Sequence, residues 1–139
     1  MNDILELIKE KGFKLTPQRI AVIHALFHCG KFFTAQQIWQ DVKKVQPEIG
    51  FDTIYRNLNL LANLGVLNQI SSPSRDGYLF EVVTSHHHHL ICLACGKTQC
   101  LDYCPIEPAK LNESQTDGFQ IVGHSFELYG YCKECKNKN

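Results

Sequence analysis

Two Cys-x-x-Cys pairs constrain the fold of this 139-residue chain more than any other feature of its sequence. One pair is Cys92 and Cys95; the other, Cys132 and Cys135, lies close to the end of the chain. Two such pairs can supply four thiolates to one tetrahedral zinc ion, each pair being held by a tight turn. A zinc site of this kind requires the last residues to fold back onto the segment around Cys92.

Four consecutive histidines lie directly before the first cysteine pair. If this run is a strand, its side chains point to alternate faces, because strand side chains have a period of two. His87 and His89 then face one way, and His86 and His88 face the other. The pattern indicates two further metal sites, one on each face.

The cysteine content and the first residues indicate a cellular compartment. The chain has seven cysteines, and an odd number argues against a closed set of disulfides. The N-terminus has early acids and no long apolar segment, so it does not read as a signal peptide. No apolar run approaches the roughly 20 residues of a membrane span. We therefore expect a cytoplasmic protein without a membrane partner, whose clustered cysteines bind metal.

The charges are balanced overall, with a formal net charge of zero. The first half is slightly basic and the second slightly acidic. This distribution slightly favours binding of a polyanion by the first half and binding of cations by the second. Apolar residues in the first half recur at helical spacing, and glycine or proline ends each run. The predicted helices cover residues 2–12, 16–30, 34–47 and 52–63. In the second helix we expect Ile20, Ile23 and Phe27 to face the core.

The fourth predicted helix has an unusual polar face. Its polar side chains include one cation and no acid: Thr53, Tyr55, Arg56, Asn57, Asn59 and Asn63. Such donors and amides can reach base edges and phosphates, as a DNA-recognition helix requires. A plain solvated face explains the composition equally well.

Two strands are predicted next, at residues 66–70 and 78–83, with a turn at Asp76-Gly77. Helices followed by a hairpin are the plan of a winged helix-turn-helix.

The pattern changes after the hairpin. Short strands are predicted at residues 90–93 and 97–101, a helix at 105–114, and a strand within 118–130. The expected fold class is α+β. An N-terminal winged helix-turn-helix domain, residues 1–83, is followed by a hinge at about 82–86 and a small α/β domain, residues 84–139.

Four motifs, in order and covering nearly the whole chain, resemble one protein family. They are KLTPQR at 14–19, DTIYRNL at 52–58, HHHHLICLACGK at 86–97, and HSFELYGYCKEC at 124–135. The chain resembles the ferric uptake regulator (Fur) superfamily of bacterial metal-sensing repressors, and most of all its zinc uptake regulator branch. The resemblance implies a DNA-binding domain, a hinge and a dimerisation domain. It also implies a homodimer on palindromic double-stranded operator DNA, with no enzymatic activity and no small-molecule substrate.

The resemblance assigns the structural zinc to Cys92, Cys95, Cys132 and Cys135. It also matches Glu81, His87 and His89 to the family's regulatory metal site. The family's N-terminal histidine ligand is replaced by Phe32. Cys100 falls where several relatives place an acidic ligand, and we add it to the site; a packed strand cysteine is the alternative. A thiolate with two imidazoles favours Zn²⁺, with Fe²⁺ or Mn²⁺ as alternatives.

An additional site in the family matches His86, His88, Glu107 and His124 of this chain. Three histidines and a carboxylate can hold zinc. Cys104 is left unassigned, either a spare thiol or an extra ligand. His24, His28 and Cys29 are expected to be core or surface residues rather than ligands.

For DNA, the resemblance points to Tyr55 and Arg56 on the recognition helix, beside Thr53. It also points to Arg19 on phosphate and Lys14 near the minor groove. A tyrosine ring can meet thymine methyl groups, and arginine offers a planar donor fork.

The resulting hypothesis is a repressor of zinc-uptake genes whose DNA binding requires zinc. Iron or peroxide sensing, a zinc hydrolase, and a zinc-stabilised interaction module are the alternatives. Cys100 and Phe32 argue against the histidine- and aspartate-rich iron site that peroxide sensing uses.

Overall fold

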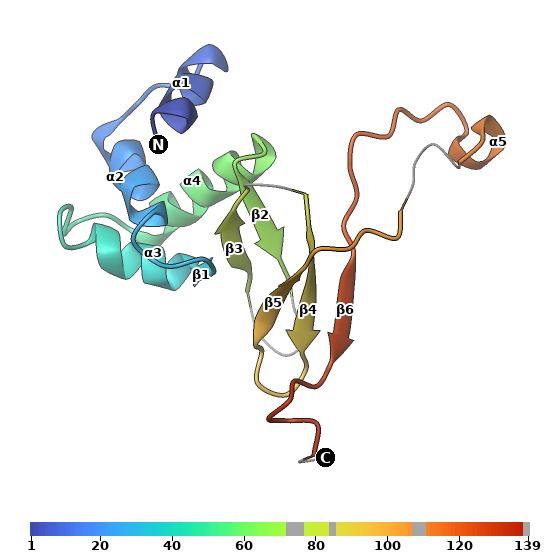
Figure 1. The fold of residues 1–139 in the computed structure, drawn as a ribbon. Coiled ribbons are helices and arrows are strands. Elements are labelled where there is room, and N and C mark those ends of the chain that lie inside the picture. The colour runs from blue at the N-terminus through green and yellow to red at the C-terminus, as the bar shows by residue number, and fades with distance from the viewer. Residues whose placement is uncertain (72–76, 84–85, 107–110, 138–139) are drawn as a thin grey trace. The chain divides into compact units, whose positions relative to one another are not determined.

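The computed structural model describes residues 1–71, 77–83, 86–106 and 111–137. These residues fall into two compact units, the first made of 1–71 with 77–83 and the second of 86–106 with 111–137 (Figure 1). The division into domains at residues 83 and 84 stays a prediction. Within the described ranges, no helix is both long enough and apolar enough to cross a membrane.

Four helices form most of the first unit. They are α1 (Asn2–Glu10), α2 (Pro17–Leu26), α3 (Ala35–Val42) and α4 (Phe51–Asn63). Thr16 caps α2, its Oγ1 accepting a 3.1 Å hydrogen bond from the amide of Arg19. Thr34 caps α3 in a capping box with Gln37. Both caps satisfy backbone amides that a helix start leaves without an intrahelical partner, which is why the threonines marked these starts in the sequence.

A three-stranded antiparallel sheet completes the first unit. Its strands are β1 (Phe33–Thr34), β2 (Leu67–Ile70) and β3 (Leu79–Val82), in the spatial order β1-β3-β2. In the hairpin, Leu67 pairs with Val82 and Ile70 with Leu79. The hairpin was predicted, whereas β1 was not. The turn predicted at Asp76-Gly77 lies partly outside the described residues. The helices with this hairpin form a winged helix-turn-helix.

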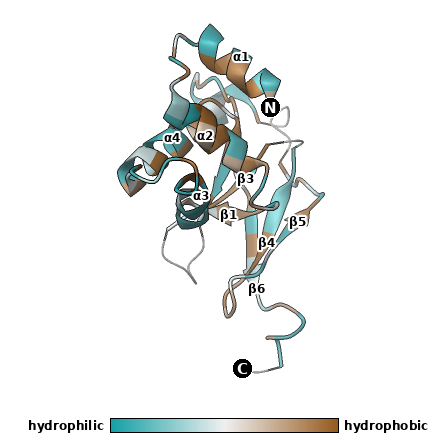
Figure 2. Cartoon of the chain, turned by 90° about the vertical axis from the view of Figure 1, so that its left-hand side faces the viewer, coloured by the Kyte–Doolittle hydropathy of each residue, from teal (hydrophilic) through white to brown (hydrophobic). Residues whose placement is uncertain are grey.

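The core of the first unit lies between its helices and the sheet. Figure 2 shows both apolar (brown) and polar (teal) segments on α1, as a helix with one buried face has. Phe33 of β1 and Phe80 of β3 are both fully buried, with ring centroids 6.3 Å apart. Fully buried aliphatic side chains surround them: Ile8, Val22, Ile23, Ile38, Ile54, Leu58 and Leu61.

The predicted inward face of α2 was wrong in part. Ile23 is buried, but Ile20 is 38% exposed and Phe27 is 49% exposed. The buried side chains of α2 are Val22, Ile23, Ala25 and Leu26. They are grouped at adjacent positions and one turn apart, so the buried face of this short helix is rotated away from Ile20. Phe27 already lies beyond the last helical residue.

The second unit is built on a three-stranded sheet with β4 in the centre. Its strands are β4 (His88–Cys92), β5 (Thr98–Leu101) and β6 (Glu127–Gly130), in the order β5-β4-β6. β4 and β5 are antiparallel, and His89 pairs with Cys100. β4 and β6 are parallel, and Cys92 pairs with Gly130. This last pairing carries the end of the chain back to the first cysteine pair.

Two expectations for the second unit were wrong in the described residues. Of the helix predicted at 105–114, residues 105–106 and 111–112 are not helical, and only the single turn α5 (Glu113–Thr116) is present. Asn112 caps α5, and Asp117, with a φ of 48°, ends it. The strand predicted within 118–130 begins only at Glu127. Phe119 and Val122 are 79% and 91% exposed, so their alternation with polar residues marks no buried strand face.

Candidate metal centres and the DNA-facing helix

The four cysteines predicted to bind structural zinc come together in the second unit. Their sulfur atoms all lie within 4.8 Å of one another. Cys95 Sγ and Cys132 Sγ are 3.8 Å apart. With Zn–S bonds of about 2.3 Å, a tetrahedral site has S···S edges of about 3.8 Å. The arrangement therefore fits one zinc ion, and none of the seven cysteines is in a disulfide.

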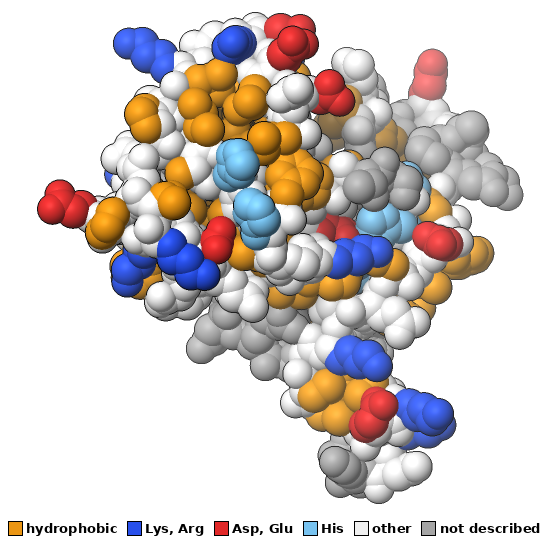
Figure 3. All heavy atoms as spheres, turned by 60° about the vertical axis from the view of Figure 1, so that its left-hand side comes forward, with side chains coloured by type: hydrophobic (Ala, Val, Ile, Leu, Met, Phe, Trp, Pro, Cys, Tyr) orange, Lys and Arg blue, Asp and Glu red, His pale blue; other side chains and the backbone are white. Residues whose placement is uncertain are grey.

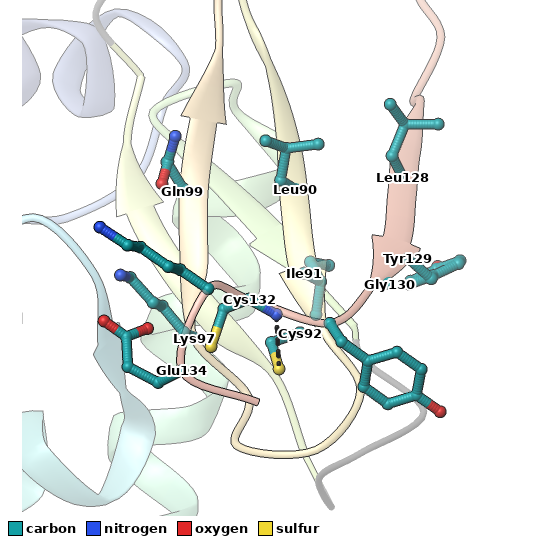
Figure 4. Close-up of a pocket in the computed structure, with 12 residues that line it drawn as sticks. Leu90, Ile91, Cys92, Lys97, Gln99, Leu128, Tyr129, Gly130, Cys132 and Glu134 are labelled. Carbon is teal, nitrogen blue, oxygen red and sulfur yellow. Dashed lines mark hydrogen bonds between the residues drawn. The ribbon is translucent and has the colours of Figure 1, made fainter. Parts of the chain in front are cut away.

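Backbone amides make the Cys92 thiol more acidic than an ordinary cysteine. Its Sγ accepts hydrogen bonds from the amides of Cys132 at 3.4 Å and Cys95 at 3.5 Å. These two donors lower the pKa of Cys92 to about 6. Figure 4 shows the bond from Cys132 as a dashed line, at the edge of a cavity of about 370 Å³ that both residues line. A thiolate is the metal-binding form of cysteine, so these amides prepare Cys92 as a ligand.

Two thiols of this group, those of Cys132 and Cys135, are harder to ionise than an ordinary cysteine. The pKa of Cys135 is raised to about 12, first by its contact with the Cys132 side chain and then by burial. Burial is also the main cause that raises the pKa of Cys132. Four close thiols resist joint ionisation because like charges repel, and a divalent cation removes this obstacle. The donor set thus matches a metal rather than a group of plain buried cysteines.

Three of the four predicted regulatory ligands lie together in the second unit. The ligand atoms of His87, His89 and Cys100 are within 4.8 Å of one another. The His87 and His89 rings have centroids 5.0 Å apart, and His89 is opposite Cys100 in the β4–β5 ladder. The strand period predicted that the two histidines share a face, and the antiparallel pairing adds Cys100 to it.

The fourth predicted ligand, Glu81, belongs to β3 of the first unit. It is buried, and its Oε1 accepts a 3.1 Å hydrogen bond from Nδ2 of Asn68 on β2. Asn68 and Glu81 are paired residues of the hairpin. This bond orients the carboxylate within the wing.

A third cluster lies on the other side of the histidine run. The ligand atoms of His86, His88, Cys104 and His124 are within 4.8 Å of one another. His124 Nε2 is 3.2 Å from both His88 Nε2 and Cys104 Sγ. The three histidines were predicted together. Glu107, their predicted partner, lies outside the described residues.

Cys104 was not assigned from the sequence. It follows β5 by three residues, in a segment without regular structure. Periodicity gives the direction of a side chain only within a helix or a strand. The one available signal was its closeness in sequence to Cys100, which did not indicate the face to which it would turn.

His88 is held in the form that binds metal. It is 3% exposed, and its pKa is lowered first by burial and then by the nearby histidines His86, His124 and His89. A low pKa keeps the imidazole neutral near pH 7, and neutral imidazole is the ligand form.

The predicted DNA residues gather where α2 and α4 meet. A groove of about 400 Å³ is lined by Thr16, Gln18, Arg19, Thr53, Arg56, Asn57 and Leu60. A second groove is lined by Phe51, Asp52, Tyr55 and Arg56. The structure therefore brings Arg19, Thr53 and Arg56 together, with Tyr55 on the neighbouring groove. Lys14 is exposed, and its carbonyl accepts a hydrogen bond from Arg19 Nη1.

Asn57 is not the surface donor that the polar pattern of α4 suggested. It is 7% exposed. Its Oδ1 accepts a 2.9 Å hydrogen bond from Arg19 Nε, and its Nδ2 donates a 2.8 Å bond to the carbonyl of Thr53. Asn57 thus connects the two helices that line the groove and holds one edge of the Arg19 guanidinium.

His24 on α2 and His28, two residues after its end, belong to the first unit and to a different part of the sequence from the histidine run. His24 and His28 are exposed, with ring centroids 5.9 Å apart. They line a groove with apolar residues that include Ile20 and Val45. On the face drawn in Figure 3, histidine side chains (pale blue) lie among hydrophobic ones (orange). In the described part of the chain, neither belongs to a group of three or more metal-ligand side chains.

Known proteins resemble the chain along nearly all of its length. The ferric uptake regulator family matches residues 10–129. The ferric uptake regulation protein of Staphylococcus epidermidis is 38% identical over 140 residues, covering 99% of this chain and 96% of that protein.

Solved structures give the same result. The ferric uptake regulator Fur of Helicobacter pylori, whose structure reveals three functional metal binding sites, matches with a TM-score of 0.71 and 25% identity. The match covers 97% of this chain and 93% of that one. A zinc-bound manganese uptake regulator matches with a TM-score of 0.61 and 27% identity, over 93% and 98% of the two chains. This chain, with its winged helix and its cysteine and histidine clusters, belongs to the ferric uptake regulator family.

Proposed function

We propose that this chain is a zinc-dependent repressor that binds palindromic operator DNA as a homodimer and controls zinc-uptake genes. Membership of the family already makes it a metal-dependent transcriptional regulator of metal homeostasis. The metal, the DNA and the oligomer are the parts that we propose. DNA binding would place its work in the cytoplasm. The observation that carries the choice of zinc is the cluster of His87, His89 and Cys100.

The chemistry of this cluster favours zinc. Two imidazoles and a thiolate are a donor set of borderline softness, which suits Zn²⁺ in four-coordinate geometry. Carboxylate, carbonyl and water ligands suit Mn²⁺ better than a thiolate does. The β4–β5 ladder holds Cys100 directly opposite His89. Two of the three donors are therefore placed by backbone pairing before any ion arrives.

Glu81 is the proposed fourth ligand, on its sequence match alone. When bound, the ion supplies a positive charge and a link between its ligands. Glu81 lies on the wing strand, whereas the other ligands lie in the second unit. Sharing the ion would hold the DNA-binding unit in one orientation, provided that this orientation binds the ion more tightly. Coupling of about 1–3 kcal/mol is usual for such a mechanism.

The DNA-binding proposal rests on the groove between α2 and α4. Arg56 and Arg19 supply donor forks suited to phosphates and guanine edges. Thr53 adds a hydroxyl, and Tyr55 a ring for thymine methyl groups. Lys14, exposed before the start of α2, is the proposed minor-groove contact.

Exposed apolar side chains on β6 support the homodimer proposal. In the described residues β6 pairs with β4 only and so forms an edge of its sheet. Leu128 and Tyr129 on this strand, and Tyr131 after it, are 44%, 49% and 52% exposed. A sheet edge with large apolar side chains is normally covered, and a second copy of the chain is the proposed cover.

An operator-binding titration tests the proposal. The probe is a fluorescent A·T-rich palindromic duplex, with a scrambled duplex beside it, at controlled free Zn²⁺, Fe²⁺ or Mn²⁺. We expect binding at low free Zn²⁺ and its loss in Cys100→Ser. Cys29→Ser is the matched control, because this half-buried cysteine lies in the first unit, outside all three clusters. Affinity should fall as salt rises, because phosphate contacts release counterions.

Iron sensing is the second candidate, and the relative from S. epidermidis favours it because that protein is named a ferric uptake regulation protein. The titration separates the candidates. If Fe²⁺ or Mn²⁺ restores DNA binding as well as Zn²⁺ does, and Cys100→Ser changes nothing, the zinc assignment is wrong. A protein that binds no duplex under any metal would instead be a zinc-stabilised interaction module.

A further inference from the structure

The cluster of His86, His88, Cys104 and His124 joins three separate segments of the second unit. His88 is the first residue of β4 and His86 precedes it by two positions, Cys104 follows β5, and His124 precedes β6. Cys104 and His124 therefore stand at the two ends of the long connection between β5 and β6. The two residues are in contact despite the 20 positions that separate them in the chain.

The nitrogen–nitrogen distance within the cluster matches that of two ligands on one ion, and the nitrogen–sulfur distance is a few tenths of an ångström shorter than such a pair has. His124 Nε2 lies 3.2 Å from His88 Nε2 and 3.2 Å from Cys104 Sγ. In a tetrahedral zinc site these edges measure about 3.3 Å between nitrogens and about 3.6 Å between nitrogen and sulfur. The His86 ring centroid is 4.7 Å from that of His88 and 4.9 Å from that of His124. All four side chains thus converge on one point.

Hydrogen bonds alone do not explain why these four side chains converge. The Nε2 atom of a neutral imidazole carries either one proton or one lone pair. His124 Nε2 can therefore complete one good hydrogen bond, yet two polar atoms lie at the same distance from it. A cation would satisfy nitrogen lone pairs and a thiolate together.

We propose that Cys104 supplies a thiolate ligand to this site, making it a centre of three histidines and one cysteine that takes a thiophilic divalent cation such as Zn²⁺. The thiol proton leaves to water when the ion binds. The proposal gives the fourth ligand position to Cys104; Glu107, the carboxylate that the sequence suggested for it, lies outside the described residues. With a sulfur ligand, the site selects Zn²⁺ or Co²⁺ over Mn²⁺, which prefers oxygen ligands. The proposal holds whether or not the chain represses zinc-uptake genes.

A cation here would also hold together the two ends of the segment that connects β5 to β6. Its described side chains are mostly exposed, with Phe119 at 79% and Val122 at 91%. Its only helix among the described residues is the single turn α5. Binding Cys104 and His124 to one ion ties the two ends of this segment, which reduces its opening. Cleavage by chymotrypsin at Phe119 should slow when the ion is bound.

The experiment uses Co²⁺ as a spectroscopic probe in the full-length chain. The protein carries Cys100→Ser, which removes the neighbouring thiolate, and retains one tightly held zinc per chain after mild chelation. On titration with Co²⁺ we expect a thiolate-to-cobalt charge-transfer band in the near ultraviolet. Adding Cys104→Ser should abolish the band, whereas Glu107→Gln and Cys29→Ser should leave it. Cys104→His should restore binding of one Co²⁺ without the band.

Protease protection is the second readout. Co²⁺ should slow chymotrypsin cleavage at Phe119 severalfold in the Cys100→Ser protein, and not after Cys104→Ser is added. The proposal is overturned if the charge-transfer band survives Cys104→Ser. It is equally overturned if Glu107→Gln abolishes Co²⁺ binding while Cys104→Ser leaves its stoichiometry and the protection unchanged.

Discussion

Arg19 Nε donates a 2.9 Å hydrogen bond to Oδ1 of Asn57, joining α2 to the helix proposed to read DNA. Asn57 in turn donates to the carbonyl of Thr53 within α4. One buried amide therefore links the two helices that line the groove through its oxygen and bonds within α4 through its nitrogen. Arg19, which the family resemblance assigned to a phosphate contact, therefore also helps to hold α2 against α4.

The first prediction follows from this contact. Asn57→Ala removes the acceptor of Arg19 from a site that is only 7% exposed. We expect a loss of unfolding free energy of about 1–3 kcal/mol, the usual cost of leaving a buried polar partner without its bond. Urea unfolding followed by circular dichroism measures it. Asn63→Ala, at an exposed position of the same helix, is the control and should change stability little. If Asn57→Ala lost no more unfolding free energy than Asn63→Ala, Asn57 would not stabilise the packing of α2 against α4.

The second prediction concerns Arg56, which is exposed and lines both grooves of the DNA-facing helix. Arg56→Ala should weaken operator binding by about 1–3 kcal/mol, as expected for loss of an arginine contact to a base or phosphate. It should leave the unfolding free energy unchanged, because the side chain is not packed in the core. Fluorescence anisotropy at several salt concentrations measures both affinity and its salt slope. Lys133→Ala in the second unit is the control; an equal effect there would mean a nonspecific loss of charge.

The sequence predicted best those features that depend on local chemistry. Thr16 and Thr34 marked helix starts because a hydroxyl oxygen can accept a hydrogen bond there from an amide without an intrahelical partner. Both caps are present. The Cys-x-x-Cys spacing predicted one cysteine cluster, and the strand period divided the four histidines between two faces. Each of these inferences needs only neighbouring residues and a known periodicity.

Features that depend on the surroundings were missed. β1 has two residues, too few to show a period, and exists because Phe33 pairs with Phe80 of β3. Ile20 and Ile23 have equal hydrophobicity and lie on the same helix, so only packing decides which is buried. Cys104 lies in an irregular segment, where no periodicity gives its direction. Tertiary contacts determine all three.

The third prediction concerns the cysteine cluster. Cys132→Ser removes one sulfur ligand and the partner of the 3.8 Å contact with Cys95. We expect loss of the tightly held zinc and unfolding of the second unit, because structural zinc binding contributes directly to folding free energy. Zinc content by mass spectrometry and thermal unfolding measure these effects. Cys29→Ser should keep both values. Full zinc content in Cys132→Ser would show that this residue is not a ligand.

The fourth prediction separates metal sensing from folding. His89→Ala removes a proposed regulatory ligand from β4 but leaves the backbone pairing with Cys100 intact. Operator binding should then no longer respond to zinc, while the oligomeric state and the tightly held zinc stay those of the parent protein. Anisotropy across a range of free zinc, together with sedimentation and zinc analysis, tests all three quantities on one sample. His24→Ala, on an exposed face of α2, is the control and should respond to zinc normally. A His89→Ala protein that still binds DNA only with zinc would exclude this histidine from the regulatory site. One that loses its dimer or its tightly held zinc would make His89 a structural residue instead.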